Sequence, residues 1–111
     1  MIKKMTKKNT TEFVTVWEFR VKSGKRREFE RAYGPDGAWA ELFRTGKGHI
    51  RTELIRDLEM PRRYLTIDSW RSREAYLSFK RKNRAEHEAI DEKCASLTED
   101  EVLVGEFQGL G

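Results

Sequence analysis

Cysteine, histidine and proline are all scarce in this sequence of 111 residues, which contains one Cys, two His and two Pro. A single Cys94 cannot form an internal disulfide, so the chain is not one of the small secreted domains that disulfide bonds hold together. We expect Cys94 to be a buried apolar residue, because reactive thiols need a nearby cation or helix N-terminus. No apolar run approaches the roughly 20 residues of a membrane span, and no apolar signal segment follows the basic N-terminus. The sequence therefore predicts a cytoplasmic protein.

Charge is abundant, since charged residues make up 38% of the chain and leave a net charge of +4. These charges are interleaved with large apolar residues, which is typical of a folded globular domain. We expect one domain over residues 12–111, preceded by a basic and flexible tail over residues 1–11. A net charge of this size would permit nucleic-acid binding, but a solvated helix face explains the Lys/Arg-rich segment 71–84 more simply.

Hydrophobic periodicity predicts the order β-α-β-β-α-β, the ferredoxin-like arrangement of an α+β fold. Strands are expected at residues 12–21, 49–58, 63–70 and 101–107. Gly34 to Gly37 should divide the first helix into two pieces, with Gly34 as a left-handed cap and Asp36 capping the second piece. Ser72 should cap the second helix, which we also expect in two pieces, and residues 98–101 should form a capped turn.

Alternation within the strands leaves large apolar residues on both faces of the sheet. In the second strand we expect Ile50 and Thr52 on one face and His49 and Arg51 on the other, with His49 exposed. Helices cover one face of such a sheet, so apolar residues must remain on the open face, and an open apolar face favours a partner. A second copy related by a two-fold axis is the simplest partner. We therefore predict a homodimer packed sheet against sheet.

Two segments resemble a known family. The segment TIDSWRSREAYLSF (66–79) ends a strand at Trp70 and starts a helix after Ser72, and VTVWEFRVKSGKRREFERAY (14–33) opens the domain. Together with the element order they resemble the antibiotic biosynthesis monooxygenase (ABM) domain family of the dimeric α+β barrel superfamily, over about residues 12–108. The resemblance implies an antiparallel sheet, a homodimeric barrel, and one cavity per subunit between sheet and helices.

The resemblance also implies an activity: oxidation of phenol- and quinol-type aromatics by molecular oxygen, without flavin or metal. The protein then has only to remove a proton, exclude water and orient the ring, so no cofactor is expected. Phe79 departs from the family, because many members carry a His nine residues after the strand-end Trp. The haem-degrading branch of the superfamily is disfavoured. Where that branch has Asn, Trp and His, this chain has Trp17, Phe79 and, at a different spacing, His87.

The candidate catalytic residues are His87 and Asp68. His87 shares a helical face with Ile90 and Cys94, which indicates an inward ring; it would act as a general base oriented by Asp91 or Asp68, or else be a satisfied core histidine. Asp68 lies mid-strand and should be paired if buried, with Arg20, Arg51 and Arg71 as possible partners in a structural ion pair.

The chain has enough aromatic residues for a substrate pocket but lacks the pattern of a metal site. The residues that would contact an aromatic substrate, or else form core, are Trp17, Tyr33, Trp39, Tyr64, Trp70, Tyr76 and Phe79. No metal site is expected, because His87 and Cys94 would lie about 10 Å apart along a helix.

Three functions are compatible with these features. The first is a cofactor-independent monooxygenase or binder of small aromatic molecules. The second is a non-catalytic dimeric module that binds a ligand or is only structural, which Phe79 favours. The third is an RNA-binding domain that stacks bases on Trp17 and Tyr64, although RRYLTIDSW lacks the Gly-aromatic pattern of the RNA recognition motif.

Overall fold

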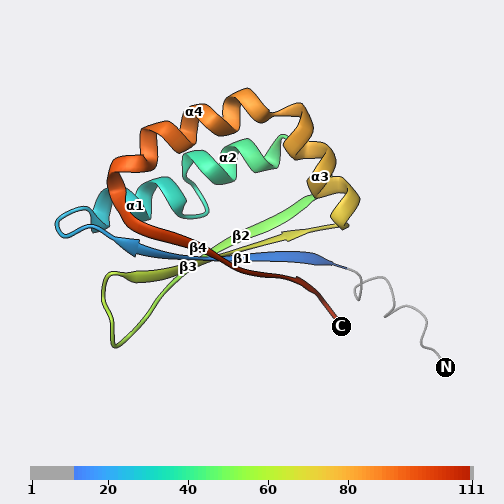
Figure 1. Ribbon diagram of the computed structural model, residues 1–111. Coiled ribbons are helices and arrows are strands. Elements are labelled where there is room, and N and C mark those ends of the chain that lie inside the picture. The colour runs from blue at the N-terminus through green and yellow to red at the C-terminus, as the bar shows by residue number, and fades with distance from the viewer. Residues whose placement is uncertain (1–11, 111) are drawn as a thin grey trace.

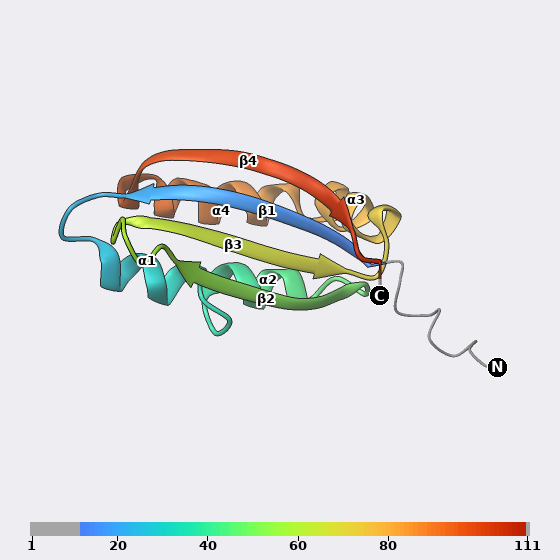
Figure 2. The same ribbon diagram turned by 90° about the horizontal axis from the view of Figure 1, so that it is seen from below.

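The computed structural model describes residues 12–110 and has two layers, with all the helices on one side of a single sheet (Figure 1). The predicted ferredoxin-like order, with both helices in two pieces, is confirmed. In chain order the elements are β1 (Phe13–Val21), α1 (Arg26–Tyr33), α2 (Ala38–Arg44), β2 (His49–Arg56), β3 (Arg63–Trp70), α3 (Arg73–Lys82), α4 (Arg84–Cys94), the short 3-10 helix η2 (Ala95–Leu97) and β4 (Thr98–Gln108). Figure 2 shows the strand order β2-β3-β1-β4, and all pairs are antiparallel.

The helix boundaries agree with the predicted caps at one place and differ at two. The Ser72 hydroxyl accepts a hydrogen bond from the backbone N–H of Ala75 at 3.1 Å, so the predicted cap of α3 is confirmed. Gly34 is extended (φ −78°, ψ 177°) rather than left-handed, and α2 is capped by Gly37 instead of Asp36, so both of these predictions were wrong. A Cβ on Gly37 would lie 2.3 Å from two carbonyl oxygens of α1, which explains the glycine there.

The last strand begins three residues earlier than expected. Thr98 pairs with Val21 and Asp100 pairs with Arg20, so the predicted turn at residues 98–101 is in fact the start of β4. The turn out of α4 is instead made by η2, whose Leu97 is buried in the core. As a result β4 runs the full length of β1 and brings Glu101 opposite Phe19.

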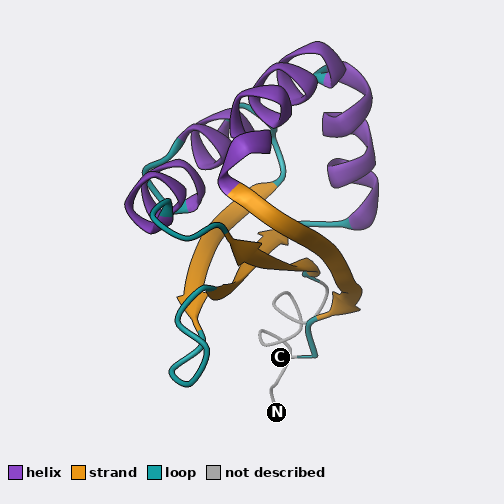
Figure 3. Cartoon of the chain, turned by 60° about the vertical axis from the view of Figure 1, so that its left-hand side comes forward, coloured by secondary structure: helices purple, strands orange, loops and turns teal. Residues whose placement is uncertain are grey.

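The face of β3 that packs under the helices is the more polar one. Its buried residues are Tyr64, Thr66, Asp68 and Trp70, whereas Leu65 and Ile67 point to the other side and are half-buried. On β1 the buried set includes Thr15, which lies directly opposite Asp68. Polar side chains thus occupy the centre of the helix-facing surface, where a core of aliphatic residues would be expected. Figure 3 shows the helices stacked on this side of the strands.

Aromatic rings form most of the core around this polar centre. One cluster packs Phe19, Phe29, Tyr33 and Trp39 against η2, and the second joins Phe13, Trp70 and Phe79 near the start of α3. The rings of Phe29 and Tyr33 stack at 4.3 Å, and most other pairs are tilted or edge-on, as aromatic quadrupoles prefer. The two clusters enclose the polar centre from both ends of the sheet.

A bulge in β2 changes which of its residues face the helices. His49 lies opposite Trp70 but Arg51 lies opposite Ser69, so two residues of β2 advance against one of β3. Ile50 is the extra residue and is 42% exposed. His49 and Thr52 consequently point to the same side, and the predicted alternation, which put His49 on the face opposite Thr52 and in solvent, was wrong.

The face of the sheet without helices, seen from below in Figure 2, carries several exposed apolar residues. Val102 and Phe107 of β4 and Ile55 of β2 are 49%, 48% and 48% exposed, and each lies beside residues of the outward faces of β1 or β3. None of the helices in residues 12–110 is long and apolar enough to cross a membrane. The predicted tail over residues 1–11 lies outside the described residues.

Candidate functional site

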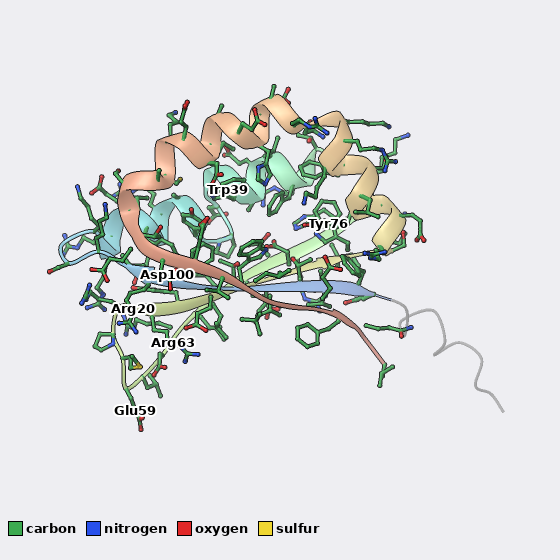
Figure 4. All side chains as sticks on the ribbon, in the orientation of Figure 1. Arg20, Trp39, Glu59, Arg63, Tyr76 and Asp100 are labelled. Carbon is green, nitrogen blue, oxygen red and sulfur yellow. The ribbon has the colours of Figure 1, made fainter. Side chains whose placement is uncertain are left out.

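A cavity of ≈ 250 Å³ lies between the helices and the centre of the sheet. Strand residues form its floor and helix residues its walls; Figure 4 shows two of the wall residues, Trp39 of α2 and Tyr76 of α3, on the helix side of the sheet. The lining residues are Thr15, Trp17, Phe19, Tyr33, Trp39, Phe43, Thr52, Thr66, Asp68, Trp70, Tyr76, Phe79, Lys80, His87, Asp91 and Glu101. The cavity therefore combines aromatic walls with a few ionisable groups, as small-molecule sites do.

Asp68 is the acidic group in the floor, and it is held by residues of the neighbouring strand. Thr52 donates its hydroxyl hydrogen to Asp68 Oδ1 at 2.5 Å, and His49 Nε2 lies 3.1 Å from the same hydroxyl oxygen and 3.6 Å from Asp68 Oδ1. The side chains of His49 and Asp68 are only 2% and 9% exposed. With Asp68 ionised, the hydroxyl donates to the carboxylate and accepts from His49 Nε2–H, which fixes the tautomer of the imidazole.

The predicted partners of Asp68 do not include these two residues. Arg51 instead pairs with Glu12 at 3.3 Å and with Glu53 at 3.7 Å, and no ion pair in residues 12–110 joins Asp68 to an arginine. The expected structural ion pair is therefore replaced by a buried hydrogen-bonded chain. Sequence reasoning missed His49 because only the bulge at Ile50 turns its ring inward, against the edges of Phe43 and Trp70 at 5.7 and 5.0 Å.

His87 of α4 reaches the cavity from the helix layer. Its ring is half-buried and meets the ring of Trp39 edge-on at 4.8 Å. Burial lowers the pKa of His87 from 6.5, with the charge of Asp91 opposing the shift and that of Lys80 adding to it. The imidazole is thus neutral at pH 7 and free to accept a proton.

Glu101 is an ionisable group of the cavity that sequence reasoning did not select. Burial raises the pKa of its carboxyl above 4.5, and the nearby charges of Asp91 and Asp100 raise it further. It lies beside Phe19 on the helix-facing surface because the register of β4 shifts between Gly105 and Leu103. Strict alternation from the outward Phe107 would place Glu101 on the open face, so a period-two pattern would not have found it.

Six of the seven predicted aromatic residues lie in the cavity lining: Trp17, Tyr33, Trp39, Trp70, Tyr76 and Phe79. Tyr64 does not; it packs on Phe29 and donates its hydroxyl to Glu30 at 2.5 Å, at the far end of the core. Burial raises the pKa of the hydroxyl groups of both Tyr33 and Tyr76 above 10, so these remain protonated near neutral pH.

Two tryptophan donors in the cavity lining are unused. The indole N–H groups of Trp39 and Trp70 are buried and have no hydrogen-bond partner among the residues that the structure describes. A buried donor without an acceptor is costly, so a bound molecule with oxygen acceptors would be stabilised by them.

The remaining candidate ligands for a metal are dispersed. Burial raises the pKa of the Cys94 thiol, which packs in the core beside Tyr33 and is unreactive in this environment. Over residues 12–110, no three His, Cys, Asp or Glu side chains are grouped as a metal site requires. No residue set can therefore be named for holding a metal ion.

The fold is shared with known structures. SnoaB, a cofactor-independent oxygenase from Streptomyces nogalater, is 22% identical, with a TM-score of 0.72 over 91% of this chain and 95% of that one. Candidate antibiotic biosynthesis monooxygenases from Bordetella bronchiseptica and Nitrosomonas europaea are 16% and 17% identical, with TM-scores of 0.71 and 0.69; they cover 91% and 92% of this chain and 99% and 93% of their own. At these identities the likeness shows the fold alone.

Sequence comparison identifies the family. A comparison with curated protein sequences gives no match. The family model for antibiotic biosynthesis monooxygenase matches residues 12–92, which span β1 through most of α4 and include every cavity residue except Glu101. The predicted resemblance is therefore confirmed, and the chain belongs to the antibiotic biosynthesis monooxygenase family.

Proposed function

We propose that the protein is a cofactor-independent monooxygenase that oxidises a phenol- or quinol-type aromatic inside the cavity. For a phenol with a free ring position the overall change is phenol plus O₂ to quinone plus water. One oxygen atom enters the ring as the new carbonyl, and the second leaves as water with the two hydrogens that the substrate loses. Molecular oxygen is the oxidant and the ring is the reductant, so the protein supplies only proton transfer, orientation and exclusion of water.

His87 is the residue that accepts the phenolic proton in this proposal. Because burial keeps the imidazole neutral, it can take the proton at pH 7 and leave an electron-rich phenolate to react with oxygen. Asp68 accepts a hydrogen bond from a second hydroxyl of a quinol, and Thr52 fixes the carboxylate for that contact. The free indole N–H groups of Trp39 and Trp70 are donors for the oxygens that carry negative charge.

The observation that carries the proposal is the cavity, which brings His87 from the helices and Asp68 from the sheet within one aromatic enclosure. Membership of the family and the shared fold of SnoaB, a cofactor-independent oxygenase, support the same reaction class. A purely structural module would not need a partly open cavity with polar groups in its floor. An RNA-binding sheet is disfavoured, because Trp17 and Tyr64 face the helices and Tyr64 is 2% exposed.

The experiment is oxygen uptake with a panel of quinols and anthrones. We expect uptake with at least one compound, a fall of about 10²-fold or more in kcat for His87→Gln, and a higher KM for Asp68→Asn. Asp36→Asn, the same chemical change at an exposed residue of the α1–α2 loop, is the matched control. Uptake no greater than that of the His87→Gln, Asp68→Asn double variant for every compound would contradict the enzyme; ligand binding without uptake would then favour the non-catalytic binding module.

The open face of the sheet supports a second part of the proposal, a homodimer formed sheet against sheet. Its outward apolar residues include Val102 and Phe107, each about half exposed in the single chain, and residues so exposed on one continuous face favour burial against an identical face. Sedimentation analysis should give twice the mass of the chain, and Phe107→Glu should give the monomer. A wild-type protein that stays monomeric at high concentration would contradict this part.

A further inference from the structure

A basic groove lies on the surface beside the cavity. It is a depression of ≈ 400 Å³ between α3 and α4, lined by Leu77, Lys80, Arg81, Arg84, His87 and Glu88, and we refer to it as the α3–α4 groove. Three of these residues are cationic at neutral pH and one is acidic. Lys80 and His87 also line the cavity, so these two side chains form the boundary between the cavity and the groove.

The cations of the groove are available to a ligand. Among residues 12–110, no ion pair within 4.0 Å joins Lys80, Arg81 or Arg84 to a carboxylate, although eight pairs of other Lys or Arg residues with carboxylates form. Lys80 is held at the boundary, because its ammonium lies 5.3 Å from the centre of the Tyr76 ring, itself a cavity residue. An anion placed there would meet positive charge without first displacing a carboxylate.

The opposite side of the cavity has the reverse charge. A second depression, which shares Tyr33, Asp91 and Glu101 with the cavity, is completed on its outer side by Asp100 and by Glu99. Glu99 pairs with Arg62 at 3.1 Å, so Asp91, Asp100 and Glu101 supply the negative charge of this side. An anionic group would be repelled from this side and attracted to the α3–α4 groove. The two charged flanks therefore define one orientation for a ligand that is anionic at one end.

From this arrangement we infer that the substrate is an aromatic molecule with an anionic substituent, such as a carboxylate, whose ring occupies the cavity while the anion lies beside Lys80 in the α3–α4 groove. This inference rests on the proposed function and specifies the substrate class of the same site. Arg81 and Arg84 extend the positive surface outward, so the substituent points toward solvent and the ring hydroxyls stay inside the cavity. Lys80 is then a specificity residue and takes no part in proton transfer.

The test compares two probes with the same rings, 2-naphthol and 6-hydroxy-2-naphthoic acid, by calorimetric titration of the full chain. Wild type should bind the carboxylated probe more tightly than 2-naphthol. Lys80→Gln should lower the affinity for the carboxylated probe about fivefold and lower that for 2-naphthol much less. Lys82→Gln is the matched control, since Lys82 also lies in the last turn of α3 but outside the groove; it should change neither affinity.

The outcomes separate this inference from the proposed function. Equal binding of the two probes by wild type, or an equal loss of both in Lys80→Gln, would overturn the anionic substrate class and leave the cavity as a binding site for neutral aromatics. If Lys82→Gln lowered the affinity for the carboxylated probe as much as Lys80→Gln does, the effect would come from general surface charge and not from the groove. That result would also overturn the inference. Failure of both probes to bind would overturn the proposed function itself, and the inference with it.

Discussion

The hydroxyl of Thr52 should contribute more to stability than any other threonine hydroxyl of the sheet. Replacing Thr52 by Val keeps the shape of the side chain and removes the bond to Asp68 at 2.5 Å and the contact with His49 at 3.1 Å. A hydrogen bond to a buried carboxylate is worth about 1.5–3 kcal/mol. The added methyl group fills the place of the hydroxyl, so no cavity term is added. We expect the free energy of unfolding to fall by about 2 kcal/mol, which lowers Tm by roughly 8 °C in a domain of this size.

The assay is urea unfolding at pH 7, with two control variants that the chain itself provides. Thr15 is more deeply buried than Thr52 and lies opposite Asp68 on the other neighbouring strand, yet its hydroxyl makes no hydrogen bond to that carboxylate. Thr15→Val should therefore cost less than about 0.5 kcal/mol. Thr52→Ser keeps the hydroxyl and its hydrogen bonds. It should therefore lower the free energy of unfolding only by about 1 kcal/mol, for the missing methyl group.

A double-mutant cycle gives the refuting result. In the Asp68→Asn background the charge that Thr52 stabilises is gone, so Thr52→Val should cost clearly less than it does in wild type. Equal costs in the two backgrounds, or equal costs of Thr52→Val and Thr15→Val, would show that the hydrogen-bonded chain of His49, Thr52 and Asp68 does not stabilise the site.

Three further expectations concern pH, the α2–β2 loop and Tyr64. Burial lowers the pKa of His87 in the folded chain, so below pH 6.5 the unfolded state binds a proton more readily than the folded state. The free energy of unfolding should therefore decrease as the pH is lowered below 6.5, and urea titrations of His87→Gln should lack this contribution to the pH dependence. A Cβ on Gly48 would lie 2.4 Å from Cβ of Ala75, so Gly48→Ala should lower Tm, whereas Gly24→Ala, which has no neighbour within 4 Å but a φ of 81°, tests backbone strain alone. Tyr64→Phe removes the bond to Glu30 and should lower stability by about 1 kcal/mol without changing oxygen uptake or its KM; a change in KM would place Tyr64 in the site.

The elements and their order could be predicted because they depend on local patterns. Strand alternation, the helical spacing of Phe29 with Tyr33, and the Ser72 cap are all properties of a few neighbouring residues. The sequence could not decide which face of β3 is covered, because Leu65 and Ile67 make the outward face the more apolar one. That choice depends on the rings of Trp70 and Tyr64, which pack on helices distant in sequence.

The site was harder to predict because two of its residues depend on irregularities of the sheet. His49 faces inward only because Ile50 is accommodated as a bulge, and a period-two pattern read from sequence assigns it to the wrong face. Glu101 faces the cavity because the register of β4 shifts between Gly105 and Leu103, which breaks its alternation with Phe107. His87 and Asp68 were found because each sits in an apolar pattern where a polar residue is unexpected, a signal that survives small shifts in register.

Phe79 couples three positions of the chain. Its ring is 4% exposed and meets Phe43 and Trp70 at 5.6 and 5.1 Å, and a Cβ added to Gly46 would lie 2.9 Å from it. A His in place of Phe79 would bury an imidazole among hydrocarbon surfaces, at a cost of roughly 1–3 kcal/mol. Positions 43, 46 and 79 therefore constrain one another, and a substitution at position 79 alone should be destabilising. Introducing a histidine into α3 would require simultaneous changes at its neighbours, which is an epistatic barrier.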